Sequence, residues 1–595
     1  MASPALAQQQ ARQQSPAAAA NKPSVNTTVV VLGAPEPVTQ ASSSRVVSVI
    51  DTKAHPLTAP TVEDYLRTDS SAYIEQRGAG NVQADISLRG GSFEQTLILL
   101  DGLRINDAQS SHHNLDLPVP LAALQTIDVL HGSGSTLYGA DALSGVVDFI
   151  TAVPTNTSLS IRAGAGSYGE NEQSAIADAV RGKWSETAAG TRTSSTGFIY
   201  DRDYRTEEAS SETRHESHLG ATSILLAGSD RKFGADQFYG NFPSWEHTKG
   251  WFASARQELG PKTQAAFGYR RHTDNFILLR NNPSYYANNH IDTSWQAVAR
   301  RKKAIHAGSG YYGLDLQGDA IDSNNLGRHA RNRGAGYADI DLHFAQRGIL
   351  SVGGREEILS GGPQAVFSPD LSGSLFLGHQ WKLRAAGGHG FRLPTYTDLY
   401  YSDPTTIGNP NLKPEAAWSG EGGADWYGGA RVTASVTYFY SRQHDAIDYV
   451  RADPAQKWRA GNLNGLAFSG VESSVHWAAT SQQALNFSYT GLSGAQSALH
   501  GQQSLYIFNY PVNNGNTEWI AQAAGFVLRN RVGAVQRYQR QAYAVWDSSL
   551  TRERGWIHPY VEITNLSNTG YEEIEGVRMQ GRAVIGGVEL TMARR

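Results

Sequence analysis

Few residues of this chain have the types and spacing that covalent or metal-assisted chemistry requires. Residues 164–169 match the pattern G-x-G-x-x-G of dinucleotide sites, but alternating segments flank them and no helical pattern follows. His215 and His218 are too close in sequence for the helical zinc motif. The chain contains no cysteine, which excludes disulfides and thiolate chemistry. We therefore predict no enzymatic site and interpret the glycines of 164–169 as a turn after a strand.

A group of acidic residues has the chemistry of a cation site. Residues 201–216 are acidic and polar, and they include Glu207, Glu208 and Glu212. Carboxylate oxygens are the ligands that Ca²⁺ prefers. The segment is therefore predicted to be a surface loop, either one that holds a structural calcium ion or one that is only solvated.

Aromatic side chains concentrate in two further segments that we interpret as loops, where binding residues are commonly found. The candidate ligand-binding residues are Phe238, Tyr239 and Trp245 in segment 233–246, and Tyr285 and Tyr286 in segment 281–290. Such side chains can border a bulky ligand, but aromatic residues also gather at membrane interfaces. Both interpretations remain open.

The elements that must position these residues begin with a small mixed part. Two short apolar runs are joined by Asp101-Gly102, a dipeptide that favours a tight hairpin because both of its residues tolerate positive φ. A second pair of apolar runs, 127–130 and 146–150, flanks a bend rich in glycine, serine and threonine. Residues 45–50 are predicted to form a first strand and residues 62–67 a short helix. Together these elements predict an α+β domain.

Past residue 153 the sequence changes to repeated alternation. In 432–440, apolar side chains occupy every second position between threonine and serine, with Phe439 as an exception. Mean hydropathy is -0.41, and we find no apolar run of about 18 residues, which excludes a spanning helix but not spanning strands. Dividing 154–595 among about 22 strands leaves about 20 residues for each strand and its connection. A soluble sandwich would alternate similarly, but a closed barrel of this size also satisfies its backbone hydrogen bonds in lipid.

Several of these stretches resemble one known family. Residues 86–107 (ISLRGGSFEQTLILLDGLRIND) and 127–151 (IDVLHGSGSTLYGADALSGVVDFIT) are similar to the plug domain of TonB-dependent outer-membrane receptors, and 391–415 and 559–582 resemble segments of the family's barrel. The resemblance implies a mainly β protein, with an antiparallel transmembrane β-barrel of about 22 strands and an N-terminal α+β plug domain inside the lumen. We expect the plug to span 38–153 and the barrel 154–595.

The N-terminal residues carry two further expectations. Residues 1–24 are predicted to be a disordered low-complexity tail or the remnant of a signal peptide. Segment 25–37 resembles the TonB box and its linker, and the box itself would be Thr28, Val29, Val30, Val31 and Leu32. An exposed β-branched run of this kind can add a strand to another protein's sheet, although it could instead be the plug's own first strand.

The resemblance also suggests where a ligand would bind. Family plugs raise a loop toward the ligand after the Asp-Gly hairpin, and the matching residues here are His112, His113 and Asn114. We expect a monomeric receptor in the outer membrane of a Gram-negative-type bacterium, surrounded by lipid and energised by the TonB complex. The expected cargo is a ferric siderophore, with cobalamin as the alternative, and no cofactor is required.

Two other classes stay open at this point. A passive porin would lack a plug, and a secreted β-rich glycosidase would be water-soluble with a buried carboxylate pair. Nucleic-acid binding is not expected, because the net charge of -4 gives no basic surface.

Overall fold

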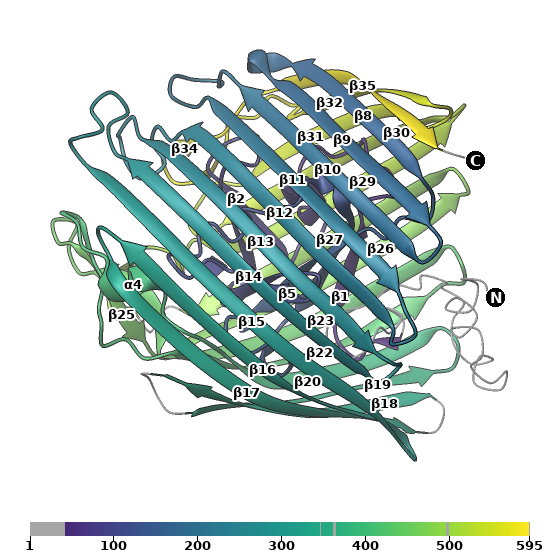
Figure 1. The fold of residues 1–595 in the computed structure, drawn as a ribbon. Helices are drawn as coiled ribbons and strands as arrows, with labels where there is room; N and C mark the ends of the chain where they lie inside the picture. Colours follow the sequence, from purple (N-terminus) through teal and green to yellow (C-terminus); the bar gives the residue numbers. More distant parts are fainter. Residues whose placement is uncertain (1–41, 345–346, 361–364, 496–498, 594–595) are drawn as a thin grey trace.

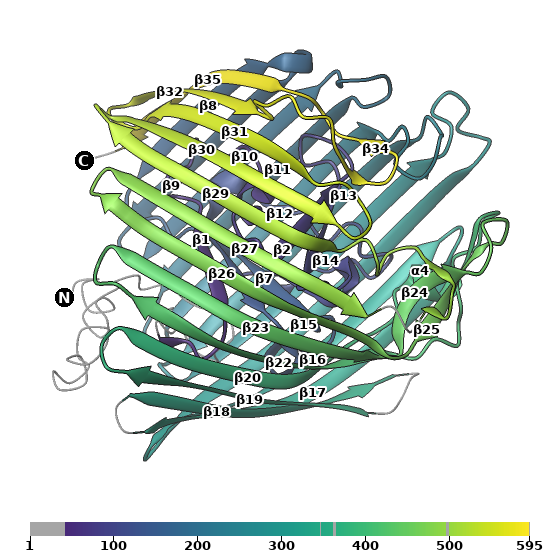
Figure 2. The same ribbon diagram turned by 180° about the vertical axis from the view of Figure 1, so that it is seen from behind.

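The computed structural model describes residues 42–344, 347–360, 365–495 and 499–593. Its main feature is a closed antiparallel barrel of 22 strands, whose lumen contains a small N-terminal domain (Figures 1 and 2). The predicted fold class is therefore confirmed. Residues 28–32, which we identified with the TonB box, lie outside the described residues.

The barrel strands follow one another in chain order around the wall, and β35 pairs with β8 to close it. They are β8 (Ser158–Gly166), β9 (Asn171–Arg181), β10 (Trp184–Ser195), β11 (Tyr204–Glu216), β12 (Ala221–Gly234), β13 (Trp245–Leu259), β14 (Thr263–Ile277), β15 (Ala287–Ile305), β16 (Gly308–Ser323), β17 (Gly327–Phe344), β18 (Gly348–Leu359), β19 (Ala365–Leu377), β20 (Trp381–Arg392), β22 (Glu415–Tyr427), β23 (Val432–His444), β26 (Leu466–Thr480), β27 (Gln483–Ala495), β29 (Pro511–Ala523), β30 (Phe526–Arg537), β31 (Tyr543–Arg552), β32 (Ile557–Thr564) and β35 (Ala583–Ala593).

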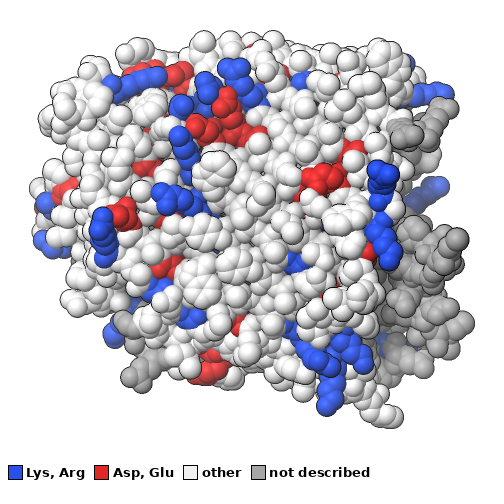
Figure 3. All heavy atoms as spheres, viewed as in Figure 1, with Lys and Arg blue, Asp and Glu red and all other residues white. Residues whose placement is uncertain are grey.

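The alternation of each strand separates an apolar outer face from a polar inner face. On β23, Val436, Tyr438 and Tyr440 are exposed on the outside, whereas Phe439, the exception in the sequence pattern, is buried in the lumen. Figure 3 shows charged side chains gathered mainly toward the two ends of the strands, with a largely uncharged band between them. An apolar outer band of this kind faces lipid.

Connections of unequal length define two rims. Turns such as 182–183, 306–307 and 524–525 form the short-turn rim, and longer segments such as 393–414 and 445–465 form the long-loop rim. Ala593, at the end of β35, pairs with Ser158 at the start of β8, so the chain both enters and leaves the barrel at the short-turn rim. In transmembrane barrels the short turns face the periplasm and the longer loops face outward.

The long-loop rim carries the remaining small elements. These are η5 (Ser167–Gly169), α4 (Tyr396–Tyr400), β21 (Thr406–Ile407), β24 (Ala446–Arg451), β25 (Trp458–Leu463), β28 (Gln503–Ser504), β33 (Glu572–Ile574) and β34 (Val577–Arg578). The predicted turn at 164–169 is confirmed, because β8 ends at Gly166 and Gly169 has a φ of 66°. No helix among the described residues is long and apolar enough to cross a membrane.

The plug is built on a sheet with the order β1-β6-β7-β4-β5. Its elements are β1 (Val47–Asp51), α2 (Val62–Leu66), β2 (Ala72–Gln76), β3 (Ala84–Leu88), η3 (Phe93–Gln95), β4 (Thr96–Leu100), β5 (Leu103–Arg104), η4 (Leu121–Ala123), β6 (Leu124–His131), α3 (Ser135–Tyr138) and β7 (Gly145–Thr151).

Sequence and structure agree closely in this domain. The turn between β4 and β5 has φ values of 51° at Asp101 and 76° at Gly102, as the hairpin prediction requires. The predicted first strand and short helix correspond to β1 and α2. The bend between β6 and β7 differs from the prediction because it contains the helix α3.

The plug core continues into the barrel wall. Its largest apolar cluster joins plug residues such as Ile98 on β4 and Ile127 on β6 to the inward-facing barrel residues Leu225 and Phe252. Smaller apolar clusters join the plug to other parts of the wall, such as Ala140 with Leu359 and Phe391 and Leu57 with Tyr560 and Ile585.

Candidate functional site: the plug apex and the seam between plug and barrel

The plug apex is organised around a buried carboxylate beneath the long-loop rim. Asp85 on β3 forms an ion pair of 2.8 Å with Arg77, which follows β2. His112 Nδ1 lies 3.0 Å from both carboxylate oxygens of Asp85. Burial alone would raise the pKa of Asp85, but His112 and Arg77 hold it below its usual value. The carboxylate therefore stays ionised and holds the Arg77 guanidinium and the His112 ring in place.

Aromatic rings from the plug and from the long loops cover this group. Phe93 stacks on His112 with ring centroids 4.4 Å apart, and Tyr506 contacts both rings edge-on at 5.4 and 5.9 Å. Tyr239 lies over the Arg77 guanidinium at 5.5 Å and donates a hydrogen bond of 2.9 Å to Gln83 Oε1. The apex thus combines aromatic rings with a guanidinium, groups that can bind an aromatic or anionic ligand.

The structure brings some of the candidate ligand-binding residues together and separates others. His112 and Tyr239 meet through Arg77 and Asp85, as described above. Tyr285 is exposed in the loop 278–286, and Tyr286 beside it accepts hydrogen bonds from Asn288 and Asn325, away from this group.

The other candidates face inward or lie at a strand end. Asn114 is buried, and its side-chain oxygen accepts a hydrogen bond from the backbone of Asp107. Phe238 is buried against Phe233, and Trp245 begins β13. His113 is buried and points to the barrel wall. Of the segment 112–114, the structure places only His112 at the apex and buries His113 and Asn114, so ligand contact by this segment stays a prediction.

The acidic segment 201–216 is not the loop that we expected. Most of it forms β11, where neighbouring side chains point to opposite faces. Glu208 faces the lumen and pairs with Arg231 at 2.8 Å, whereas Glu207 faces outward near Arg205. Glu212 pairs with Arg214 at 2.8 Å. These carboxylates do not converge on one point, so their arrangement gives no support to the calcium prediction.

Sequence reasoning missed Arg77, Asp85, Phe93 and Tyr506. Phe93 lies within the plug stretch used for the resemblance and Asp85 directly before it, so a closer search of that stretch could have found them. Tyr506 had no local signal, because its role depends on a loop that folds over the plug from a distant part of the chain.

An ion-pair cluster at the end of β3 ties the plug to the barrel. Arg89 makes a bidentate contact with Glu472, at 2.8 and 2.7 Å, and a further contact with Glu421. His131 lies between Glu472, at 3.2 Å, and Asp69, at 2.8 Å. We call these five residues the Arg89 cluster. Although burial alone would lower the pKa of His131, the carboxylates of Asp69 and Glu472 raise it to about 10.

A second cationic contact reinforces the same seam. Arg392 on the barrel contacts Glu94 of the plug at 2.9 Å and is held by Asp398 at 3.0 Å and Glu415 at 2.7 Å. The plug is therefore tied to the wall by buried ion pairs as well as by apolar packing.

A cavity runs along the seam on another side of the plug. It has a volume of about 190 Å³ and lies between the plug and strands β9–β11 and β30–β32. Arg67 and Asn81 line it from the plug, and Glu172, Arg531 and Asp547 line it from the barrel. A cavity of this size with charged groups in its lining has room for water.

A wide barrel in a membrane, filled by a separate domain that charged contacts hold in place, defines a gated outer-membrane transporter. The comparisons with known proteins identify the family. Residues 162–581 match the family model "TonB dependent receptor-like, beta-barrel", and residues 38–146 match "TonB-dependent Receptor Plug Domain". The chain belongs to the TonB-dependent receptors, which are outer-membrane proteins of Gram-negative bacteria.

Similar proteins match most of this chain at about 25% identity. Vitamin B12 transporter BtuB of Vibrio vulnificus (strain YJ016) is 25% identical over 490 residues, covering 75% of each chain. An iron-regulated outer membrane virulence protein of Vibrio cholerae is 24% identical over 474 residues, covering 69% of this chain and 70% of the relative.

Solved structures share the fold at lower identity. The siderophore receptor PirA from Acinetobacter baumannii superposes with a TM-score of 0.75 at 15% identity, covering 93% of this chain and 99% of PirA. The Serratia marcescens hemophore receptor HasR gives a TM-score of 0.77 at 15% identity, covering 92% of this chain and 99% of HasR.

The family assignment confirms the predicted class and its location. The long-loop rim is therefore extracellular and the short-turn rim periplasmic. The filled lumen contradicts the passive-porin alternative, and membership of a receptor family contradicts the secreted glycosidase.

Proposed function

We propose that this TonB-dependent receptor imports a ferric siderophore. The observation that carries the proposal is the apex, where Arg77, His112 and three aromatic rings lie beneath the extracellular loops. A second cation–π pair lies at the long-loop rim, where Arg451 of β24 lies 4.1 Å from the ring centroid of Trp458 of β25. Ferric siderophores that carry anionic oxygen donors on aromatic rings would be recognised by cation–π and charge-assisted contacts.

Cobalamin is the second candidate, and a different observation favours it. The vitamin B12 transporter of Vibrio vulnificus matches this chain over three quarters of both sequences. The affinity of a bulky ligand with little net charge would depend more on the aromatic rings of the apex than on Arg77.

Uptake in this proposal needs no catalysis and no cofactor. The ligand binds to a monomer from outside, the inner-membrane TonB complex pulls on residues 28–32, and the plug moves along its polar seam. Binding and transport are therefore separable, because the energy enters from the partner.

Equilibrium binding of the purified receptor to ferric siderophores, cobalamin and haem tests the cargo. We expect Tyr506→Ala and Tyr239→Ala to weaken binding of the true cargo by roughly 5-fold each, since a well-placed aromatic contact contributes about 1 kcal/mol. Tyr285→Ala, in a loop away from the apex, is the matched control and should bind normally. Absence of binding to every ferric siderophore tried, with tight binding of cobalamin, would reverse our ranking.

Deletion of residues 28–32 tests the energised step in cells. We expect the deletion to abolish uptake while cargo binding to the purified protein is unchanged. Undiminished uptake would contradict coupling through this segment.

A further inference from the structure

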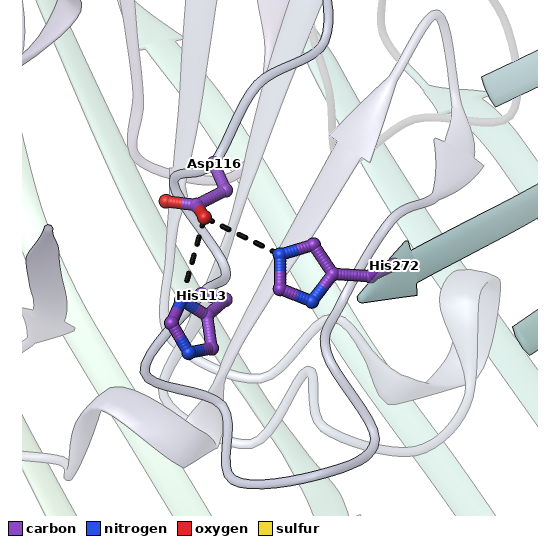
Figure 4. Close-up of side chains that lie close together, drawn as sticks. All are labelled: His113, Asp116 and His272. Carbon is purple, nitrogen blue, oxygen red and sulfur yellow. Dashed lines mark hydrogen bonds and ion pairs between the residues drawn. The ribbon is translucent and has the colours of Figure 1, made fainter. Parts of the chain in front are cut away.

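A buried group of potential metal ligands joins the plug to the barrel wall on the side of β14. His113 and Asp116 belong to the plug segment that follows the Asp-Gly hairpin, and His272 lies on β14 (Figure 4). Each side chain is at least nine-tenths buried. We call these three residues the His113 cluster. None of them belongs to the apex or to the Arg89 cluster.

The separations of the ligand atoms suit a small metal ion. Asp116 Oδ2 lies 3.3 Å from His113 Nδ1 and 3.3 Å from His272 Nε2. With metal–ligand distances of about 2.0–2.1 Å, neighbouring ligands in a tetrahedron lie about 3.3 Å apart. All three atoms lie within 4.8 Å of one another, so a modest rotation of the two imidazole rings would place them around one ion.

The remaining atoms of the three ligands are held as metal ligands usually are. Behind His272, the free Nδ1 faces Asp292 Oδ1 at 3.4 Å, and Arg270 holds Asp292 at 2.6 Å. A carboxylate behind a histidine fixes the tautomer that presents its other nitrogen to a metal.

His113 and Asp116 have the same kind of support. His113 Nε2 faces Glu246 Oε1 at 3.5 Å, with Asp274 beyond it at 3.8 Å. Asp116 contacts Arg231 through Oδ1, at 2.9 Å, and its Oδ2 accepts a hydrogen bond of 3.1 Å from the Thr248 hydroxyl. A carboxylate oxygen has two lone pairs, so Oδ2 keeps one for the shared position.

Unpartnered atoms provide an independent indication that a ligand is needed. His113 Nδ1, Asp274 Oδ1 and Asp292 Oδ1 are buried and make no hydrogen bond within the described part of the chain. Glu246 and Asp274 contact His113 but no arginine or lysine of the described residues. Buried carboxylates without a cation are costly. A positive charge placed between the imidazoles would offset that cost.

We propose that His113, Asp116 and His272 bind one divalent transition-metal ion of the Zn²⁺ class, which links the plug to β14. Imidazole nitrogen and carboxylate oxygen suit Zn²⁺ and its neighbours better than Ca²⁺, which prefers oxygen ligands alone. The ion would fasten one plug segment to the wall, and that link would have to break before the segment could move. The proposal does not depend on the cargo that the receptor carries.

Metal binding to the full-length receptor in detergent tests the proposal. After treatment with a chelator, the protein is titrated with ZnCl₂ and separately with CoCl₂. We expect one tightly bound ion per chain and the intense visible absorption of tetrahedral Co²⁺. His113→Gln and His272→Gln should each weaken binding by at least about 100-fold, and Asp292→Asn by roughly 10-fold to 100-fold because it only orients His272. His215→Gln, on β11, is the matched control and should bind normally.

Folding and cargo binding are measured on the same samples. Circular dichroism shows whether a variant has failed to fold. If a histidine variant does not fold, the conservative Asp292→Asn variant still tests the proposal. Absence of stoichiometric binding by the wild type overturns the proposal, as does unchanged affinity in His272→Gln. The alternative is that both imidazole rings are protonated and bind no metal ion. In that case Zn²⁺ would not change the thermal unfolding temperature. If the wild type binds the metal ion but no cargo, the result counts against the proposed function and not against the metal site.

Discussion

The Arg89 cluster offers the sharpest test of how the plug is held. In Arg89→Met the side chain keeps a similar length, but its charge and all of its hydrogen bonds are lost. The native guanidinium makes two bonds to Glu472, contacts Glu421 and lies 4.7 Å from the ring of Phe439. Because the substitution removes the cation that two buried glutamates share and leaves Glu472 with His131 alone, we expect it to destabilise the docked plug by about 3–5 kcal/mol.

Hydrogen exchange of plug amides measures this loss directly. Protection of peptides from β3 and β6 should fall by roughly 100-fold to 4,000-fold, since each factor of ten corresponds to about 1.4 kcal/mol. Amides of β16 next to the short turn 306–307 provide an internal control, because no member of the Arg89 cluster lies on that strand.

A triple variant separates charge from packing. Adding Glu421→Gln and Glu472→Gln removes the unpaired carboxylates, so part of the lost protection should return. Unchanged plug protection in Arg89→Met would refute the claim that this cluster holds the plug, and a further loss in the triple variant would refute the electrostatic explanation.

Three further predictions concern single positions. Burial raises the pKa of Glu63 to about 7, so this carboxyl group lowers the stability of the plug as pH rises from about 4.5 to 7. Glu63→Gln should therefore stabilise the plug by roughly 1–3 kcal/mol at pH 8 and by little at pH 4, as measured by urea unfolding. Tyr438→Arg places a cation in the middle of the lipid-facing side of β23 and should destabilise the barrel by about 2–4 kcal/mol in lipid; equal stability would contradict the membrane-facing assignment. Gly102→Val should cost about 1–2 kcal/mol of plug stability because φ is 76° at this position, whereas Gly102→Asn should cost less. Similar losses of stability in the two variants would show that backbone strain does not cause the destabilisation.

Local patterns were sufficient for much of the architecture. The Asp101-Gly102 dipeptide specified its hairpin, because the turn requires positive φ at both central residues and few pairs of residue types adopt that conformation. Alternation in 432–440 gave the outer face of β23, and even the exception was informative, since Phe439 lies in the lumen against Arg89.

The acidic segment shows where pattern reasoning failed. Residues 204–216 form a strand whose inner face is polar because it faces the plug, not a dry core. A polar lumen and a surface loop favour the same residue types. Composition could not distinguish them, so Glu207, Glu208 and Glu212 were assigned to a loop.

By itself, the sequence determined the properties that depend on neighbouring residues: the two-part organisation, the turns, the outer face of the strands and the family. Only the tertiary structure decided which distant side chains meet. Arg89 and Glu472 are separated by 383 positions in the chain, and His113 reaches His272 only because the barrel closes around the plug. The physical reason is that the functional contacts lie on a seam between two domains, where position is set by closure of the barrel and not by the local preferences of the chain.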